Sequence, residues 1–208
     1  MKILVTGGCG YIGTQLVKKL KEDGQDVKTL DTDENADYVC DLSHHVPVLP
    51  NFDYVYHLAA SSRVEPCENN RKKAFMDNVV ATENICYRFG QIIYPHTYLD
   101  TKTTYGYTKA LSARIVEHYG GTVKVLTNVF GYDGPGVIDS YLRKYEKDES
   151  LGICLGETRF DFVHMDEVVR RLISTAFSYV GSGKLLSLES VANMFPLGTT
   201  RHYFQGTP

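Results

Sequence analysis

Long apolar runs are absent from this chain of 208 residues. No stretch approaches the roughly twenty apolar residues that a helix needs to cross a bilayer. The opening "MKILVTGGCGYIG" has only a short apolar stretch before its glycines, so we expect neither a signal peptide nor a membrane span. The sequence predicts a cytoplasmic protein with no membrane partner.

The sequence also lacks a cluster of charges of one sign. Its 22 basic and 25 acidic residues are mixed along the chain and leave a formal net charge of -3. The basic run "RKK" at 71–73 is too short to attract a polyanion. We therefore expect no nucleic acid as a partner.

Paired cysteine motifs are a third absence. The cysteines are odd in number, widely scattered and nowhere in the spacing of a metal-ligand pair, which indicates reduced thiols that fill core space. We expect no disulfide framework, no zinc and no other metal. The five are Cys9, Cys40, Cys67, Cys86 and Cys154.

The chain does have enough apolar sequence, 43% hydrophobic residues, to fold as one domain or as one domain with a small appendage. Short apolar runs alternate with helical patterns, which is typical of a parallel sheet covered by helices on both faces. We predict an α/β fold with a doubly wound parallel sheet of the Rossmann type. The expected strands are 2–6, 26–31, 37–42, 53–59, 91–95 and 122–129, and the expected helices are 11–23, about 72–90 and 105–119.

The pattern loosens after about residue 130. A turn cluster, "GYDGPG", is followed by a predicted helix over 137–146, a short strand near 152–156 and an amphipathic helix that starts at 166. We expect a dinucleotide-binding domain over 1–130, and a reduced substrate-binding part over 131–208 that is interleaved with the end of the sheet.

The motif "TGGCGYIG" places glycines at 7, 10 and 13, after a predicted strand and at the start of a helix. Such a turn lets backbone N–H groups and the positive end of a helix approach a pyrophosphate. Asp31 ends the next strand, where a carboxylate accepts hydrogen bonds from a ribose diol and repels a 2'-phosphate. The motif predicts NAD rather than NADP, and the alternative is a structural glycine turn beside an ordinary exposed aspartate.

The stretch "TTYGYTK" puts Tyr105 four residues before Lys109, about one helical turn apart. This spacing alone is more often a solvated or core-edge pair than a catalytic one. Its meaning depends on the rest of the sequence.

Several motifs in order resemble the extended short-chain dehydrogenase/reductase family, the NAD-dependent nucleotide-sugar epimerases and dehydratases. They are "TGGCGYIG", "CDL" at 40–42, "YHLAA" at 56–60, "NVVATENI" at 78–85, "YGYTK", "NVFG" at 128–131 and "RFDFVHMDEVV" at 159–169. The chain looks like an unusually short member. The resemblance implies NAD as cofactor, held by Gly7, Gly10, Tyr11, Ile12, Gly13, Asp31, Asp41, Leu42, Leu58, Ala59, Ala60 and Lys109.

The resemblance also implies a catalytic set of Tyr105, Lys109 and Thr97. Tyr105 would be the base that removes a proton from a sugar hydroxyl, and Thr97 would hydrogen bond the same oxygen. Lys109 would hold the nicotinamide ribose, and its ammonium and the positive nicotinamide ring are expected to lower the phenol's pKa from about 10. The alternative for Thr97 is a strand-end threonine bonded only to backbone.

The chain departs from the family in its connection between Thr97 and Tyr105, which is residues 98–104 alone. Seven residues span at most roughly 25 Å, so the connection is feasible, but one wall of the substrate site is lost. The acidic pair of the dehydratases and the cysteine of the epimerase-reductases that make GDP-fucose are missing after Thr97. An NAD-recycling epimerase is the function that remains.

The C-terminal part is implied to bind a nucleotide-sugar substrate through Asn128 and Arg159, since a guanidinium suits phosphate oxygens. A surface arginine is the alternative for Arg159. His164 is expected to be packed or hydrogen-bonded rather than catalytic, and Asp166 is expected to cap its helix. Two other functions stay open: an NAD-linked dehydrogenase or reductase on a smaller substrate, and a non-catalytic dinucleotide-binding protein. The family likeness suggests a homodimer through the helices near 72–90 and 105–119.

Overall fold

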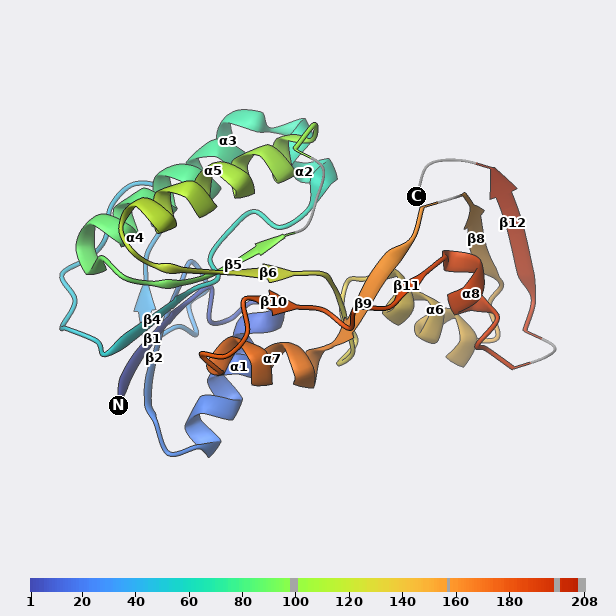
Figure 1. Cartoon of the computed structure of the whole chain (residues 1–208), viewed down its shortest axis with the longest axis horizontal. Coiled ribbons are helices and arrows are strands. Elements are labelled where there is room, and N and C mark those ends of the chain that lie inside the picture. The colour runs from blue at the N-terminus through green and yellow to red at the C-terminus, as the bar shows by residue number, and fades with distance from the viewer. Residues whose placement is uncertain (98–100, 157, 197–198, 206–208) are drawn as a thin grey trace. The chain divides into compact units, whose positions relative to one another are not determined.

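The computed structural model describes residues 1–97, 101–156, 158–196 and 199–205 (Figure 1). The chain forms two compact units. The first is Met1–Val125 with Leu172–Tyr179, and the second is Leu126–Arg171 with Val180–Pro208. In the described ranges, no helix combines the length and the apolar character needed to cross a membrane.

The first unit is built on a seven-stranded sheet with the order β10-β6-β5-β4-β1-β2-β3. Strand β1 pairs in parallel with both β2 and β4, so the chain reverses its direction of winding between β1 and β4. This order is that of a doubly wound Rossmann sheet, in which ligands bind outside the carboxyl ends of the strands at the reversal point. The strands are β1 Lys2–Thr6, β2 Asp26–Asp31, β3 Tyr38–Val39, β4 Tyr54–His57, β5 Ile93–Thr97, β6 Thr122–Leu126 and β10 Tyr179–Val180.

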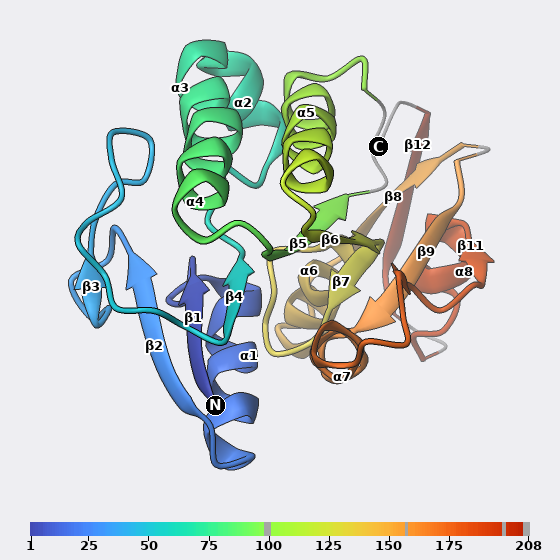
Figure 2. The ribbon, with the colours of Figure 1, turned by 60° about the vertical axis from the view of Figure 1, so that its left-hand side comes forward.

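Helices cover both faces of this sheet (Figures 1 and 2). Helix α1 lies on one face and buries residues spaced for a single helical stripe: Gly13, Leu16, Val17 and Leu20. Helices α3, α4 and α5 lie on the other face. The helices of this unit are α1 Tyr11–Glu22, α2 Val64–Asn69, α3 Arg71–Phe75, the π-helical turn η1 Met76–Val80, α4 Ala81–Phe89 and α5 Thr104–His118.

The second unit has a core of its own, formed by Tyr141, Leu151, Ile153, Phe162, Leu188, Val191 and Ala192. A three-stranded sheet has the order β11-β9-β7, with β7 and β9 parallel, and β8 pairs in parallel with β12. The elements are β7 Asn128–Phe130, α6 Val137–Glu146, β8 Leu151–Leu155, β9 Phe160–His164, β11 Leu185–Leu186, α8 Leu188–Ala192 and β12 Arg201–Gln205, with α7 Met165–Ile173 at the unit boundary.

The predicted fold class is confirmed, and four predicted elements are corrected. The strand expected over 37–42 is reduced to β3 Tyr38–Val39, which pairs with the end of β2. The strand expected over 122–129 is broken, because β6 pairs within the first sheet whereas β7 pairs with β9. The strand expected over 91–95 starts two residues later, because Gly90 ends α4 at a φ of 69° and the chain turns before β5. The helix expected over 72–90 contains η1, an irregularity that apolar periodicity does not reveal.

Candidate active site

The glycine turn lies between the end of β1 and the start of α1. Gly7 has a φ of 67°, and a Cβ there would lie 2.6 Å from the Ala59 backbone nitrogen. A Cβ on Gly13 would lie 2.0 Å from the Gly7 carbonyl oxygen, so only glycine lets α1 come this close to the turn. Gly10 is the N-cap of α1 and supplies no side-chain cap. The helix therefore presents its first turn, Tyr11, Ile12 and Gly13, at this edge of the sheet.

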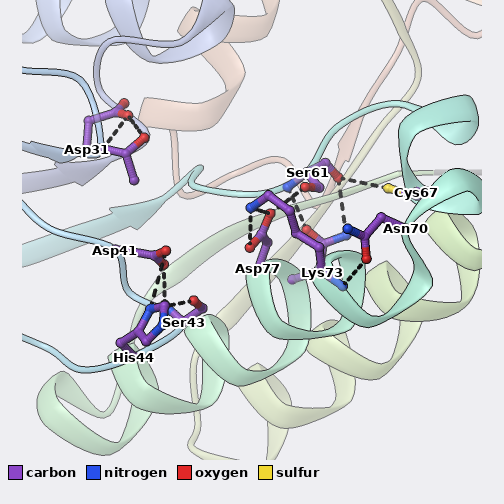
Figure 3. A network of polar contacts seen from close by, with 11 residues as sticks. Asp31, Asp41, Ser43, His44, Ser61, Cys67, Asn70, Lys73 and Asp77 are labelled. Carbon is purple, nitrogen blue, oxygen red and sulfur yellow. Dashed lines mark hydrogen bonds and ion pairs between the residues drawn. The ribbon is translucent and has the colours of Figure 1, made fainter.

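Asp31 ends β2 beside the glycine turn. One carboxylate oxygen accepts a hydrogen bond from the Cys9 backbone N–H at 3.0 Å, and the other accepts from the Thr32 N–H at 2.8 Å. Figure 3 shows the Asp31 carboxylate. These bonds fix the carboxylate against the turn that precedes α1. The structure thus brings Asp31 and the glycine turn together.

Asp41 and Leu42 are held by their own surroundings. The Asp41 carboxylate accepts from the Ser43 backbone N–H at 2.9 Å and lies 3.4 Å from His44 Nδ1 (Figure 3). The hydrogen bond from the Ser43 side chain is the main cause that lowers the pKa of Asp41. Leu42 is 4% exposed and packs in the core of the first unit.

Leu58, Ala59 and Ala60 follow β4 and lie against the end of β1. The Leu58 N–H donates to the Thr6 carbonyl at 3.0 Å, and the Ala59 N–H donates to Thr6 Oγ1 at 3.3 Å. The backbone after β4 is thereby fixed at the winding reversal of the sheet. These three residues and Gly7 belong to one packed edge.

A buried chain of hydrogen bonds runs inward from this edge through His57. Thr82 Oγ1 donates to the Asn78 carbonyl at 2.6 Å, so it accepts from His57 Nε2 at 3.0 Å. His57 Nε2 therefore carries the proton, and Nδ1 accepts from Thr6 Oγ1 at 2.6 Å. Burial lowers the pKa of His57 to about 3, and the charge of Lys109 adds to this effect. His57 is neutral and links β1 to α4 through Thr6 and Thr82.

The neutral His57 predicts a loss of stability in mild acid. Below pH 6.5 the unfolded chain binds a proton that the folded chain does not bind until about pH 3, so the free energy of unfolding falls as the pH falls. Between pH 7 and pH 5 the loss from this one group is about 2 kcal/mol. Urea unfolding at both pH values measures it. His57→Gln is expected to be less stable at pH 7 but flatter with pH, and equal slopes for the two proteins would contradict the assignment.

The residues expected to be catalytic meet at the end of β5 and the start of α5. The Thr97 side chain lies near enough to the Tyr105 hydroxyl to favour its ionised form, although the short connection separates the two residues in sequence. Lys109, one turn further along α5, is 4% exposed. Its ammonium nitrogen lies 4.0 Å from the centroid of the Tyr94 ring on β5.

The expected lowering of the Tyr105 pKa is wrong for the protein in this form. Burial raises the pKa of Tyr105 to about 12, and only the Thr97 side chain opposes the rise. Burial also lowers the pKa of Lys109 to about 7. The ammonium group is directed at Tyr94 and carries only part of its charge at neutral pH, so it does not favour the phenolate.

Two groups beside Tyr105 were not predicted from the sequence. Glu68 on α2 accepts from the Thr104 backbone N–H at 2.6 Å and from Thr104 Oγ1 at 2.9 Å, which fixes the first residue of α5. The Asn78 side chain accepts from the Ser61 N–H at 2.7 Å and donates to Thr108 Oγ1 at 2.9 Å. Acidic and amide residues in short helices carry no periodic signal that would have identified these contacts.

Around Asn78, a polar network ties η1 to the loop after β4 (Figure 3). Ser61 Oγ donates to Asp77 at 2.6 Å, and Lys73 Nζ donates to the same carboxylate at 2.7 Å. The Cys67 thiol points to the Ser61 carbonyl at 3.7 Å. This network supports the helices that carry the Tyr105 side of the site.

The residues expected to bind substrate lie in the second unit. Asn128 is exposed at the start of β7 and donates to the Asp161 carbonyl at 3.2 Å, and Arg159 is exposed just before β9. The expected cap is corrected, because α7 begins at Met165 and the Asp166 N–H donates to His164 Nδ1 at 3.3 Å. The Asp166 carboxylate instead accepts from the Tyr132 hydroxyl at 2.7 Å.

Comparison with known proteins identifies the part of the chain that carries the glycine turn. Residues 3–91 match the NAD dependent epimerase/dehydratase family. The match covers less than half of the chain, and it contains the glycine turn and Asp31. The family's cofactor, as its description states, is NAD.

Similarity to curated proteins and solved structures extends beyond residue 91. UDP-glucuronic acid decarboxylase 1 of Arabidopsis thaliana is 30% identical over 149 residues, which cover 64% of this chain and 33% of that protein. The structure of Pal from Bacillus thuringiensis is similar with a TM-score of 0.85 at 19% identity, over 99% of this chain and 86% of Pal. MoeE5 in complex with UDP-glucuronic acid and NAD has a TM-score of 0.81 at 23% identity, over 99% of this chain and 86% of MoeE5. At these identities the two structures show a shared fold.

The chain is short beside its sequence relatives. It spans between 30% and 62% of the length of the curated relatives that it matches. The whole-protein activities in their names therefore reach this chain only as a proposal.

Proposed function

We propose that this protein is an NAD-dependent enzyme of the nucleotide-sugar epimerase type, which oxidises a sugar hydroxyl transiently and reduces the product again. The observation that carries the proposal is the pairing of Thr97 with Tyr105, one helical turn from Lys109. The glycine turn lies outside the end of β1 in the same sheet. Cofactor-binding and proton-transfer groups thus belong to one unit.

The residues of the first unit fit NAD. A Cβ on Gly7 or Gly13 would fill the space that the close turn leaves, and α1 has no side-chain cap to compete for an anion at its first turn. Asp31 offers a carboxylate at the end of β2, where it suits a ribose diol. Leu58, Ala59 and Ala60 would line the cofactor from the end of β4, with Asp41 and Leu42 near the adenine. When bound, NAD supplies reversible hydride acceptance.

The side chains around Tyr105 have distinct roles in this proposal. Tyr105 would take the proton from the substrate hydroxyl, and Thr97 would hold the same oxygen by a hydrogen bond. To take a proton, Tyr105 needs a pKa below its present value of about 12. A positive charge within about 4–6 Å of the phenol oxygen would lower that pKa. Lys109 is the residue of α5 that can supply this charge. Asn128 and Arg159 would bind the nucleotide sugar in the second unit.

A second function is favoured by the connection of residues 98–104. Only seven residues separate Thr97 from Tyr105, which leaves little chain to enclose a large substrate. An NAD-linked dehydrogenase or reductase that acts on a smaller substrate would use the same Tyr105, Thr97 and Lys109. The decisive difference is whether a nucleotide sugar binds at all.

The experiment that tests the function is a thermal melt with single ligands, since a ligand that binds only the folded state raises the melting temperature. The panel is NAD, NADP and UDP-, dTDP- and GDP-sugars, with UDP-glucuronic acid included because MoeE5 binds it. The expected result is a shift with NAD, a smaller shift with NADP because Asp31 repels its phosphate, and an added shift with one nucleotide sugar. Turnover of that sugar is then followed by NMR. A shift with NAD alone would refute the epimerase and leave the second function.

We also propose that the protein forms a homodimer through α4 and α5. These helices, with the adjoining α3, expose Phe75, Tyr87 and Tyr107 at 43%, 83% and 53%. Light scattering after gel filtration is expected to give twice the mass of the chain. Tyr87→Glu should shift the population to monomer, whereas a monomeric parent protein would contradict the proposal.

A further inference from the structure

The interior of the first unit holds a lysine against an aromatic ring. Lys109 on α5 is 4% exposed and Tyr94 on β5 is 1% exposed, and 4.0 Å separates the ammonium nitrogen from the ring centroid. A cation within about 6 Å of a ring centroid is attracted by the negative face of the ring, most strongly where water is excluded. The pair meets both conditions.

No carboxylate contributes to the charge balance of Lys109 among the residues that the structure describes. Burial is the one cause that lowers the pKa of Lys109 to about 7. Asp77 on the neighbouring η1 is bound by Ser61 and Lys73. The ring face of Tyr94 is therefore the group next to the ammonium that favours its charged form.

The other titratable groups around the pair are neutral at pH 7. His57 stacks on Tyr94 with ring centroids 5.8 Å apart. Burial is the largest cause that lowers the pKa of His57 and of His96, and the positive charge of Lys109 is the second. Burial raises the pKa of the hydroxyl and thiol groups. The full set of neutral titratable groups around Lys109 and Tyr94 is His57 on β4, Tyr94 itself and His96 on β5, Tyr105 on α5, Cys67 on α2 and Cys86 on α4.

We propose that Tyr94 is a positioning residue for Lys109, whose ring binds the buried ammonium group in place of a carboxylate. A neutral partner keeps the ammonium available to a second group, whereas a carboxylate would neutralise it. The consequence for turnover rests on the proposed function: the charge that Tyr94 retains on Lys109 is the charge that Tyr105 needs. The titration of Lys109 itself does not depend on that function.

The Tyr94 hydroxyl takes no part in this role. Within the described residues, Tyr94 Oη has no hydrogen-bond partner in good geometry, although Ser112 and Thr82 lie close enough to oppose the rise of its pKa. A buried polar group without a partner destabilises the fold, so its removal is neutral or favourable. Tyr94→Phe therefore keeps the ring and serves as a matched variant that separates the ring from the hydroxyl.

The experiment follows the side-chain signals of isotopically labelled lysine by NMR over pH 5–11, in the protein without ligands. Lys109→Met identifies the Lys109 signal. The wild-type protein is expected to titrate far below the ordinary lysine value of about 10.4, and Tyr94→Phe should titrate at the same pH and melt at an equal or higher temperature. Tyr94→Leu and Tyr94→Met remove the ring and should lower the pKa of Lys109 by about 1.

The control is Tyr56→Leu. Tyr56 lies on β4, and its side chain is as buried as that of Lys109, at 4% exposure. Tyr56 pairs with Ile93 and so faces the side of the sheet away from Tyr94, and its loss should leave the Lys109 titration unchanged. If Tyr94→Leu and Tyr94→Met, both folded, titrate like the wild type, the proposal is overturned. If both ring-removing variants lower the pKa of Lys109 but NAD does not raise the melting temperature of the wild-type protein, the proposed function is refuted and the role of Tyr94 stands.

Discussion

Replacing Tyr105 by phenylalanine is expected to lower turnover of the nucleotide sugar by about 10²- to 10⁴-fold, the usual contribution of a general acid–base group. The phenol is the group that meets Thr97 at the end of β5, and phenylalanine keeps the ring while removing the oxygen. The NAD-induced melting shift should persist, because the glycine turn and Asp31 are unaltered. Steady-state kinetics and thermal melts with NAD measure the two effects separately.

Tyr107→Phe is the matched control for this substitution. It changes the same residue type two positions along α5, where the side chain is 53% exposed, and phenylalanine keeps the apolar ring that Tyr107 offers to the proposed dimer surface. Turnover and melting temperature should both stay at the wild-type level. Equal turnover in Tyr105→Phe and wild type would remove Tyr105 from the mechanism, and an equal loss in both variants would indicate damage to α5 instead.

Gly13→Ala is expected to destabilise the fold by about 3 kcal/mol or more, which lowers the melting temperature by roughly 6–12 °C in a chain of this size. In an exposed helix the same change would stabilise by about 1 kcal/mol. Here the added Cβ would lie 2.0 Å from the Gly7 carbonyl oxygen, and backbone on both sides must move to accept it. The NAD-induced shift should disappear, because α1 can no longer approach the turn.

Gly10→Ala provides the comparison within the same turn. Its Cβ would lie 3.2 Å from the Gly7 carbonyl oxygen at a φ of -76°, so a shift of a few tenths of an ångström accommodates it. The expected loss is about 1 kcal/mol, that of a weaker N-cap. If Gly13→Ala melted at the temperature of Gly10→Ala, the close approach of α1 to the turn would not be a requirement of the fold.

Much of the first unit could be predicted because its signals are local. The bounds of β1 and β2 follow from apolar runs that end at turn residues, and both match the prediction to the residue. The glycines at 7 and 13 are required by a close backbone approach, which their spacing in the sequence reveals. Tyr105 and Lys109 were found through their helical separation together with ordered motifs.

The remaining features depend on partners that are distant in sequence. Glu68 binds Thr104 across 36 residues, and the direction of the Lys109 side chain depends on a ring from another element. Burial raises the pKa of Tyr105, and the Lys109 charge does not counter it in this form. The lowering expected from Lys109 and the nicotinamide ring together stays a prediction for the NAD-bound protein. The break between β6 and β7 reflects a change of pairing partner, which no pattern within 122–129 encodes.

The π-helical turn η1 acts as a one-residue insertion in an otherwise continuous helix. It leaves the Asn78 carbonyl open to hydroxyl groups, and Ser112 Oγ on α5 donates to it at 2.7 Å. Deleting one residue between 76 and 80 would restore regular winding and leave the helix faces before and after it in register. The Asn78 carbonyl would then accept a hydrogen bond of the helix's own ladder and would no longer be open to Ser112. The extra residue in this segment thus supplies a buried acceptor that joins the helix to α5, and its deletion should weaken that joint without turning α4.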